Sequence, residues 1–257
     1  MGAKTRKDSI IEILEEQGYV TVKYLMETLH YSSATINRDL NDLQAQHLIT
    51  RSYGGAELVG STYVPVPFRS HKMRAEKRYI GRAAAGLVED GDTIFIDGST
   101  TSQCMEQSLV GRKNLTVITN NILLAANLST HGVRVICLGG EIVEAPSMLC
   151  GAETVENAAR YRVDKMFFST GAVSGDGMIA SGVYDLVLRA VAKRARQVVY
   201  LVDHKKVDQP FHTVWGDFSE VDTVISDYEF PSDTKARYAK TRFLRVEGSG
   251  HETENLD

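Results

Sequence analysis

The segment Asp97-Gly98-Ser99-Thr100-Thr101 combines small residues, hydroxyls and a carboxylate in an order that suits the binding of an anion. It follows an apolar run at 92–96 and precedes a predicted helix that begins near Ser102. Backbone N–H groups and the positive end of a helix dipole face outward at such a point, and the three hydroxyls add further donors. The segment predicts a loop that binds the phosphate of a small sugar phosphate. An ordinary turn with a Ser/Thr helix cap is the alternative.

Polar or glycine-containing segments also follow four other apolar runs. In all, apolar runs lie at 93–96, 115–118, 133–138, 166–168, 198–202 and 223–225. Helical patterns alternate with these runs at 102–109, 122–129, 154–159 and 183–195. This alternation predicts an α/β domain with a parallel sheet, in which ligands bind at the carboxyl ends of the strands. The residues predicted to contact the sugar phosphate are Asp97, Gly98, Ser99, Thr100, Thr101, Thr119, Asn120, Gly139, Gly140, Gly171, Asp203 and Lys206.

The chemistry of these residue types suggests separate roles. Gly139 and Gly140 would let a ligand approach the backbone closely. Lys206 would neutralise a phosphate, and Asp97 or Asp203 would accept hydrogen bonds from sugar hydroxyls. Each residue taken singly also fits a turn, a helix cap, a tight bend or a solvated lysine. The convergence of five strand ends is what favours a binding site.

The composition is that of a globular protein, with 43% hydrophobic and 24% charged residues in a chain of 257. The net charge of −4 gives no bulk attraction to nucleic acid. Three cysteines without C-x-x-C spacing argue against a disulfide scaffold or a zinc site and predict buried free thiols. No apolar run reaches the roughly 18 residues of a membrane span, and acidic residues interrupt the N-terminal segment. We expect a cytoplasmic protein without metal or cofactor.

The first sixty residues carry the pattern of three short helices followed by a hairpin. Apolar spacing predicts a helix over 6–17, a second helix capped by Thr21 and a third capped by Ser32 or Ser33. Apolar residues on either side of Gly54-Gly55 predict a β-hairpin wing. This order is typical of a winged helix-turn-helix. The core face of the third helix carries Ile36, Leu40 and Leu43.

The opposite face of the third helix and the wing carry groups that suit contacts with DNA. Arg38 has forked donors for a phosphate or a guanine, and Asn37 offers an amide to adenine. Asp39 would be repelled by phosphates, so we expect it to pair within the domain or to cap a helix. Arg51 and Tyr53, near the tip of the wing, are expected to reach the DNA backbone or the minor groove. The residues predicted to contact DNA are Ser33, Thr35, Asn37, Arg38, Arg51 and Tyr53.

The charge of this segment argues against a strongly basic DNA-binding module. Residues 1–60 contain six Lys/Arg and eight Asp/Glu, a net charge of −2. Four of the acids fall on the first predicted helix, so Arg38 and Arg51 can cluster on another side. Three amphipathic helices also build bundles that do not bind DNA. The pattern alone is therefore consistent with two alternatives, a generic helical bundle and a DNA-binding head.

Two sets of motifs resemble the DeoR/GlpR family of bacterial transcription regulators. The head resembles it in Ser32 to Leu40 and in Arg51 to Ala56, and the larger part in Asp97 to Thr101, Thr119-Asn120, Leu138-Gly139-Gly140 and Asp203-x-x-Lys206. The family's usual recognition helix reads T-I-R-R-D-L, and this chain departs from the family pattern at five positions. They are Asn37 for an arginine, Tyr53 for a common histidine, Ser99 for a glycine or threonine, and Asp185 and Arg189 for a frequent Glu and Lys.

The resemblance covers about residues 5–246 and implies a winged helix-turn-helix joined to a sensor domain similar to ribose-5-phosphate isomerase. It implies a repressor of sugar metabolism genes that binds double-stranded operator DNA and is controlled by a phosphorylated sugar or polyol. A homodimer or homotetramer is expected, because a small head reads a short half-site. The predicted limits are 1–60 for the head, 61–75 for a linker, 76–247 for the sensor and 248–257 for a disordered tail.

Two functions of other classes compete with this hypothesis. The fold resemblance allows a sugar-phosphate isomerase, for which Asp185 would be the base, but a winged head has no role in isomerisation. We assign no catalytic residue. An architectural DNA-binding protein with a vestigial pocket is disfavoured by the low charge of the head and by the intact strand-end motifs.

Overall fold

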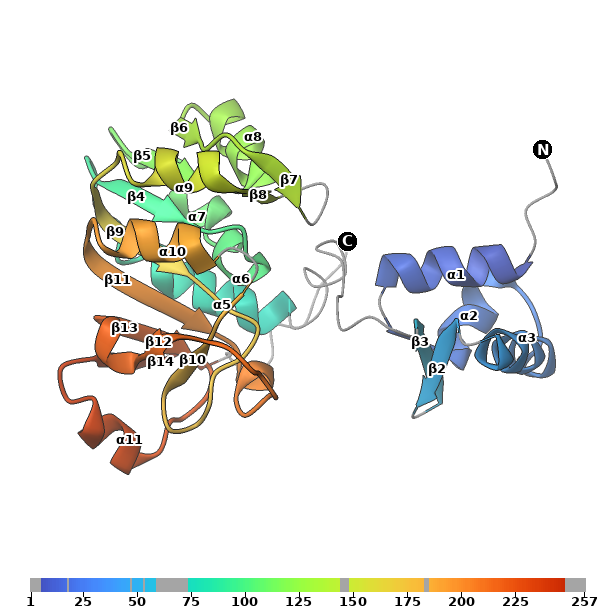
Figure 1. Cartoon of the computed structure of the whole chain (residues 1–257). Coiled ribbons are helices and arrows are strands. Elements are labelled where there is room, and N and C mark those ends of the chain that lie inside the picture. The colour runs from blue at the N-terminus through green and yellow to red at the C-terminus, as the bar shows by residue number, and fades with distance from the viewer. Residues whose placement is uncertain are drawn as a thin grey trace. The chain divides into compact units, whose positions relative to one another are not determined.

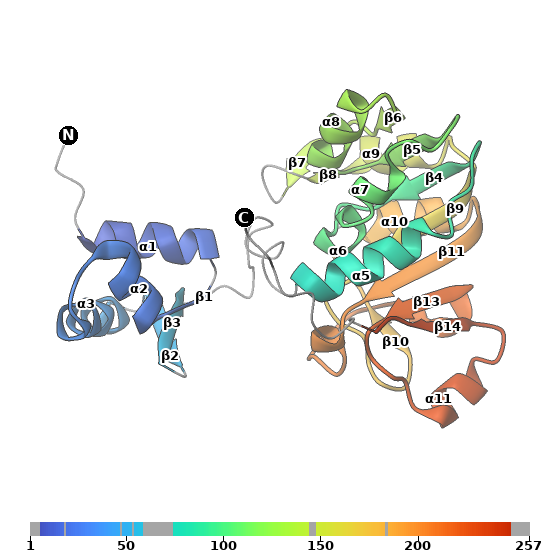
Figure 2. The same ribbon diagram turned by 180° about the vertical axis from the view of Figure 1, so that it is seen from behind.

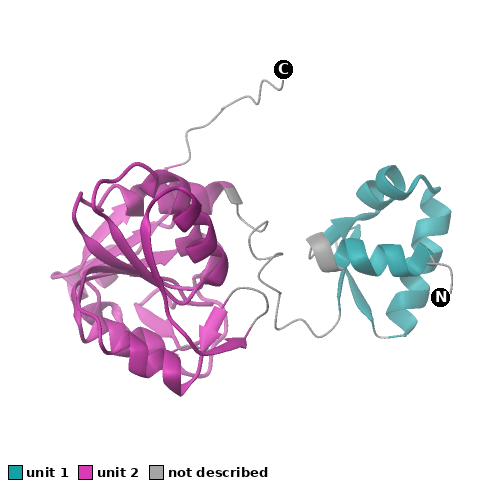
Figure 3. Ribbon diagram, turned by 90° about the horizontal axis from the view of Figure 1, so that it is seen from above, with its two compact units in different colours: residues 1–72 teal, residues 73–257 magenta. Residues whose placement is uncertain are grey.

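The computed structural model describes residues 6–17, 19–46, 48–52, 54–58, 74–143, 148–182 and 185–247. The chain divides into two compact units, residues 1–72 and 73–257, which Figure 3 colours separately. Tyr53, the predicted tail 248–257 and the predicted linker up to residue 73 lie outside the described residues. The domain limits and the disorder of the tail therefore stay predictions.

The smaller unit packs three helices against a three-stranded antiparallel sheet (Figure 1). The strand order is β1-β3-β2, in which β2 and β3 form the predicted wing hairpin. The winged helix-turn-helix prediction is confirmed. The elements are α1 (Arg6–Gln17), β1 (Tyr19–Thr21), α2 (Val22–Leu29), α3 (Ser33–Ala45), β2 (Ile49–Ser52) and β3 (Gly55–Leu58). The buried core is Ile10, Leu14, Val20, Leu25, Ile36, Leu40, Leu43, Ile49 and Ala56.

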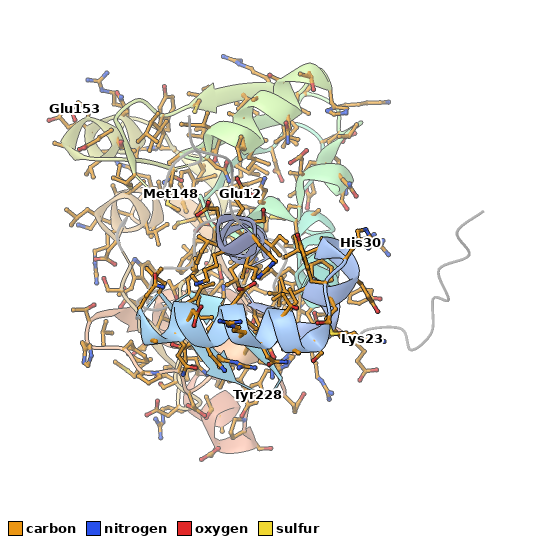
Figure 4. All side chains as sticks on the ribbon, turned by 90° about the vertical axis from the view of Figure 1, so that its right-hand side faces the viewer. Glu12, Lys23, His30, Met148, Glu153 and Tyr228 are labelled. Carbon is orange, nitrogen blue, oxygen red and sulfur yellow. The ribbon has the colours of Figure 1, made fainter. Side chains whose placement is uncertain are left out.

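Hydroxyl caps begin α2 and α3, and one left-handed residue turns the chain between the two helices. The Thr21 hydroxyl accepts from the Tyr24 N–H at 3.1 Å, and the Ser32 hydroxyl accepts from the Thr35 N–H at 3.3 Å. Ser32 rather than Ser33 is therefore the cap of α3. His30, labelled in Figure 4, ends α2 with a φ of 57°, which turns the chain sharply toward α3.

Asp39 is buried and accepts hydrogen bonds from both ends of the Arg6 guanidinium, one of them at 3.0 Å. The expectation that Asp39 pairs internally is confirmed. The carboxylate raises the pKa of Arg6. Since Arg6 lies on α1, this pair ties the first helix to the recognition helix.

The larger unit is built on a seven-stranded sheet with helices on both faces (Figures 1 and 2). Its order is β14-β13-β11-β9-β4-β5-β6, and every neighbouring pair is parallel, as predicted. The strands are β4 (Thr93–Ile96), β5 (Thr116–Thr119), β6 (Arg134–Cys137), β9 (Val163–Phe168), β11 (Ala195–Val202), β13 (Thr223–Ser226) and β14 (Arg242–Arg245). The helices are α5 (Arg74–Ala85), α6 (Thr100–Gln103), α7 (Glu106–Leu109), α8 (Ile122–Thr130), α9 (Ala152–Ala158), α10 (Asp185–Ala192) and α11 (Ser232–Arg237).

Successive side chains along each strand point to opposite faces, which creates two cores. Ile94 and Ile96 of β4 pack with α5, α7 and α8 on one face. Phe95, between them, packs with α9 and α10 on the other. Because helices cover both faces of the sheet, its strands carry continuous apolar runs.

The structure differs from the sequence predictions at the shorter elements. The predicted helix over 102–109 was wrong, because two separate four-residue helices, α6 and α7, occupy that segment. The helix predicted over 183–195 ends at Ala192, since Ala195 already pairs with Val163 of β9. The sequence pattern did not indicate β14 or two small antiparallel sheets. These pair β7 (Glu141–Val143) with β8 (Met148–Cys150), and β10 (Met178–Ala180) with β12 (Val214–Asp217).

None of the three cysteines forms a disulfide, and they are not all buried as predicted. Cys150 is buried, Cys104 is partly buried and Cys137 is exposed. Cys137 lies on β6, the edge strand of the sheet, which explains its exposure.

Candidate effector site and DNA-binding surface

The chain reverses its direction of travel across the sheet between β4 and β9. From β4 it continues through β5 to β6 on one side, and from β9 it continues through β11, β13 and β14 on the other. In open parallel sheets, ligands bind outside the carboxyl ends of the strands at such a switch point. The segments Asp97–Thr101 and Ser169–Gly171 follow these two strands directly.

Asp97 holds the two switch-point segments together. Its side chain is fully buried, and it accepts from the Ser99 hydroxyl at 2.8 Å and from the Ser169 N–H at 3.4 Å. Burial raises the pKa of this carboxyl, and hydrogen bonds from Ser102 and Ser99 act against that rise. Both oxygens are thus engaged within the protein. Asp97 supports the loop, and its predicted role of accepting sugar hydroxyls stays a prediction.

Two lysine amines meet the hydroxyls of the loop after β4. Lys77 of α5, buried to 4% exposure, donates to the Thr100 hydroxyl at 3.1 Å. Lys206 donates to the Thr101 hydroxyl at 3.1 Å and to the Ser169 hydroxyl at 2.9 Å. Each of the two adjacent threonine hydroxyls therefore accepts a hydrogen bond from a different lysine, and the two lysines are far apart in the sequence. Two cations concentrated at a switch point are suited to a phosphate.

The residues predicted to contact the sugar phosphate did not include Lys77 or Ser169. Lys77 belongs to a basic run from Arg69 to Arg78, most of which we expected to be a solvated helix face, with Lys77 as the exception that lies near the ligand cleft. Ser169 directly follows β9, so its place at a strand end was the available signal.

Two acceptor atoms at the strand ends have no hydrogen-bond partner among the described residues. They are Asn120 Oδ1, after β5, and Asp203 Oδ2, after β11. Asn120 is fully buried and Asp203 is 2% exposed. The Asp203 oxygen lies 3.8 Å from the Lys206 amine, which gives it an ion pair without a hydrogen bond. Buried acceptors are normally satisfied, so these two atoms indicate donors such as ligand hydroxyls.

Of the four predicted glycines, two are required by packing, Gly139 has one ordinary contact at 3.6 Å, and Gly171 has open space. A Cβ on Gly98 would lie 2.4 Å from the Met148 side chain, and Gly140 has a φ of +139° with a Cβ position 1.9 Å from Thr154 Oγ1. Tertiary packing therefore explains both residues. Gly171 is exposed, and a Cβ there would meet no atom within 4 Å. Gly171 is the position where a ligand has room.

The other predicted effector residues lie toward the β6 edge and take structural bonds. The Thr119 hydroxyl donates to the Ile96 carbonyl at 2.6 Å and joins the ends of β4 and β5. The Gly139 carbonyl accepts from the Thr154 hydroxyl of α9 at 2.7 Å. The structure thus brings Thr100, Thr101, Gly171, Asp203 and Lys206 to the three central strands β4, β9 and β11, with Gly139 and Gly140 at the edge.

The departures from the family pattern at Asp185 and Arg189 form a structural pair. The Arg189 Nε donates to the Asp185 carboxylate at 2.9 Å, one turn apart on α10. The Arg189 Nη2 donates to the Val214 carbonyl at 3.2 Å and also to the Trp215 carbonyl. This pair fastens α10 to β12. Asp185, the candidate base of an isomerase, is therefore ion-paired with Arg189.

A cavity of about 510 Å³ lies at the other end of the sheet, away from the residues just described. Its lining comprises Thr93, Arg162, Val163, Asp164, Lys193, Arg194, Ala195 and Arg196. Asp164 accepts from the Thr93 N–H at 2.9 Å and pairs with Arg196 at 3.1 Å. The cations that line this cavity are exposed to solvent. Its size alone therefore does not outweigh the carboxyl edge, where Lys77 is buried, Lys206 is partly buried and two acceptors are buried.

The predicted DNA-contacting residues lie on α3 and β2, with Tyr53 outside the described residues. Ser33 and Arg38 are exposed, whereas Thr35, Asn37 and Arg51 are partly exposed. Ile36, Leu40 and Leu43 are buried on the opposite side of α3, so the predicted division of its faces is confirmed. Arg51 contacts α3 through Asn37 and Asn41, and the sequence analysis did not single out Asn41.

A winged helix-turn-helix followed by a parallel α/β unit with a polar switch point defines a DNA-binding transcription regulator with a sensor domain. Comparison with known families agrees with this class. Residues 6–62 match the DeoR-like helix-turn-helix domain, and residues 72–228 match the DeoR C terminal sensor domain. The chain belongs to the DeoR family of transcriptional repressors.

Curated relatives match nearly the whole chain. The chain is 34% identical to the glycerol-3-phosphate regulon repressor of Escherichia coli K12, over 86% of this chain and 90% of that protein. It is 32% identical to the HTH-type transcriptional repressor GlcR of Bacillus subtilis 168, over 88% and 89%. It is 30% identical to the lactose phosphotransferase system repressor of Staphylococcus aureus N315, over 89% and 94%. These relatives are transcriptional repressors and not enzymes.

Among solved structures, ribose 5-phosphate isomerase A from Neisseria gonorrhoeae matches 51% of this chain and 52% of its own, at 16% identity and a TM-score of 0.38. A likeness this weak carries no argument about function. In the described ranges, no helix has the length and apolar character needed to cross a bilayer.

Proposed function

We propose that the carboxyl edge of the seven-stranded sheet binds a phosphorylated sugar or polyol, and that this ligand controls repression by the winged helix. The observation that carries the proposal is the pair of lysines, Lys77 and Lys206, donating to adjacent threonine hydroxyls at the switch point. The names of the relatives support it, since they refer to glycerol-3-phosphate and lactose phosphotransferase regulation.

The site offers separate groups for the two halves of such a ligand. Lys206 and the hydroxyls of Thr100 and Thr101 are the donors for phosphate oxygens. Asp203 and Asn120 supply buried acceptors for ligand hydroxyls. The predicted dipole contribution is small, because α6 contains only four residues. The phosphate is therefore held by lysines and hydroxyls more than by a helix end.

The ligand controls DNA binding only if it prefers one of two states of the protein. Coupling between two sites typically amounts to about 1–3 kcal/mol, a change of roughly 5- to 150-fold in affinity. We propose that the protein acts in the cytoplasm as a homodimer or homotetramer, because paired heads reading repeated half-sites supply the affinity that one small head lacks. No cofactor takes part in this function.

A thermal-shift screen of the full chain tests the sensing half of the proposal. Triose, pentose and hexose phosphates, the matching unphosphorylated compounds and inorganic phosphate would each be added in excess. One phosphorylated compound at about 100 times its Kd is expected to add roughly 2.7 kcal/mol of stability, whereas its unphosphorylated form is not. Gel-shift binding to the chain's own upstream DNA that ignores every sugar phosphate would contradict the proposal.

Gly171→Val is expected to block the ligand without unfolding the protein. The new side chain enters open space, where a Cβ meets no protein atom within 4 Å, and the ligand would have to displace it. The measurement is the thermal shift with the phosphosugar found in the screen, together with the melting temperature of the unliganded variant.

Gly140→Ala is the control that shows the effect of a side chain added at a crowded glycine. Its Cβ would lie 1.9 Å from Thr154 Oγ1, and the backbone φ there is +139°. We expect this variant to lose about 1–3 kcal/mol of stability through backbone strain and steric overlap. A Gly171→Val protein that keeps the full ligand response would show that the open space is not the binding site.

A further inference from the structure

Arg51 on β2 is joined to the recognition helix by two amide side chains. Its Nη1 donates to Asn41 Oδ1 at 2.5 Å, and its Nη2 donates to Asn37 Oδ1. Asn37 and Asn41 are one helical turn apart on α3, away from the core face. We call Arg51, Asn37 and Asn41 the Arg51 clamp. The clamp holds the guanidinium of a wing residue against the helix that reads DNA.

The orientation of Asn37 in the clamp follows from donor and acceptor chemistry. A guanidinium only donates, so the amide oxygen must face Arg51. The Asn37 amide nitrogen donates to the Ser33 carbonyl at 2.8 Å and to the Ser33 hydroxyl at 3.1 Å. Both amide hydrogens are therefore used within the head. Paired recognition of an adenine, the predicted role of Asn37, would require breaking these bonds.

The clamp leaves Arg51 charged and able to donate. Two of its five N–H groups meet the amides, and no bond to another described residue is made by the other three. Arg6 provides the contrast, because its guanidinium is neutralised by the buried Asp39 carboxylate. Neutral amides position Arg51 without cancelling its charge. An arginine fixed in place before association also avoids part of the ordering cost of binding.

We propose that Arg51 reads a guanine in the major groove of the operator and that Asn37 and Asn41 are its positioning residues. A recognition helix lies in the major groove, so a guanidinium held on its exposed side enters the groove with it. Forked contact with guanine O6 and N7 is the commonest specific contact of arginine. This inference rests on operator binding by the winged helix.

Selection of binding sites from randomised DNA tests the proposal with the full-length protein. The wild type, Arg51→Ala, Asn37→Ala and Asn41→Ala would be compared with Gln44→Ala. Gln44 is the control because it is an exposed amide on α3 outside the clamp. We expect Arg51→Ala to relax the preference for one guanine in each half-site, by about 5- to 150-fold. The two Asn variants should weaken the same position by a smaller factor, and Gln44→Ala should leave it unchanged.

Binding measured on the selected duplex adds two discriminating readouts. Arg51→Lys keeps the positive charge and loses the fork, so we expect it to keep the salt dependence of binding and lose the guanine preference. Replacing the critical guanine with 7-deazaguanine should weaken the wild type and leave Arg51→Ala unaffected. The double variant Asn37→Ala/Arg51→Ala should lose no more affinity than Arg51→Ala alone, because Asn37 acts through Arg51.

Three outcomes would overturn the inference. An Arg51→Ala protein that loses affinity equally for all sequences, with a shallower salt slope, would place Arg51 on a phosphate. Asn37→Ala relaxing a different base position from Arg51→Ala would make Asn37 a base-reading residue. Unchanged base preference in Arg51→Ala would exclude Arg51 from readout. Circular dichroism of each variant shows that the head is folded. A wild type that selects no sequence would instead contradict operator binding itself.

Discussion

Thr100→Ala combined with Thr101→Ala is expected to abolish the response to the phosphosugar, both in thermal shift and in DNA binding. The two hydroxyls accept from the Lys77 and Lys206 amines at 3.1 Å each. Their removal takes away two donors to the phosphate and the groups that position both lysines. Hydrogen bonds to charged groups contribute about 1.5–3 kcal/mol each. Loss of both hydrogen bonds to the phosphate therefore lowers the ligand affinity by roughly a hundredfold or more.

The control for this variant is Thr100→Ser combined with Thr101→Ser, which keeps both hydroxyls and removes only two methyl groups. We expect it to respond to the ligand. Both threonines are buried, so the Ala variant also loses some stability, and its melting temperature without ligand is measured first. Operator binding in the absence of ligand should be retained. A full ligand response in the Ala variant would place the phosphate elsewhere.

Arg38→Ala is expected to do the reverse and weaken operator binding while leaving the ligand response intact. Arg38 is exposed near the start of α3, where a recognition helix meets base edges and phosphates. The expected cost is about 1–3 kcal/mol if the arginine makes a forked contact with a base. Fluorescence anisotropy with the operator duplex measures the affinity, and the thermal shift with phosphosugar checks the sensor.

Arg38→Lys separates charge from geometry at this position. The lysine keeps the electrostatic attraction to phosphates but cannot make a forked contact. Wild-type affinity in Arg38→Lys together with a loss in Arg38→Ala would indicate a phosphate contact. No change in either variant would show that Arg38 lies off the DNA.

The repeating patterns of the sequence were sufficient for most of the fold. Apolar spacing predicted the three helices and the wing of the head, and the cap at Thr21 is where its hydroxyl pattern indicated. Alternation of short apolar runs with helices predicted the parallel sheet. These signals succeeded because helix and strand periods place each residue toward the core or toward solvent by local geometry.

Local patterns failed at the short elements, and they could not separate the different reasons for the glycines. A single helix was expected over 102–109, where the chain forms two separate turns of helix. Gly98 and Gly140 were predicted to face a ligand, whereas Met148 and Thr154 occupy the space beside them. A glycine required by packing and a glycine required by a ligand look the same in a sequence, because both leave only a missing side chain.

The sequence by itself determined which residues end strands, which face of α3 is buried and which family the chain resembles. Only the tertiary structure decided that β9 lies beside β4, that Lys206 reaches Thr101 across 105 positions of the chain, and that Arg51 is held by Asn37 and Asn41. It also assigned Asp97 to the support of the loop. The physical reason is that periodicity reports the environment of one residue along its own element, whereas a site is made by side chains that packing brings together from distant segments.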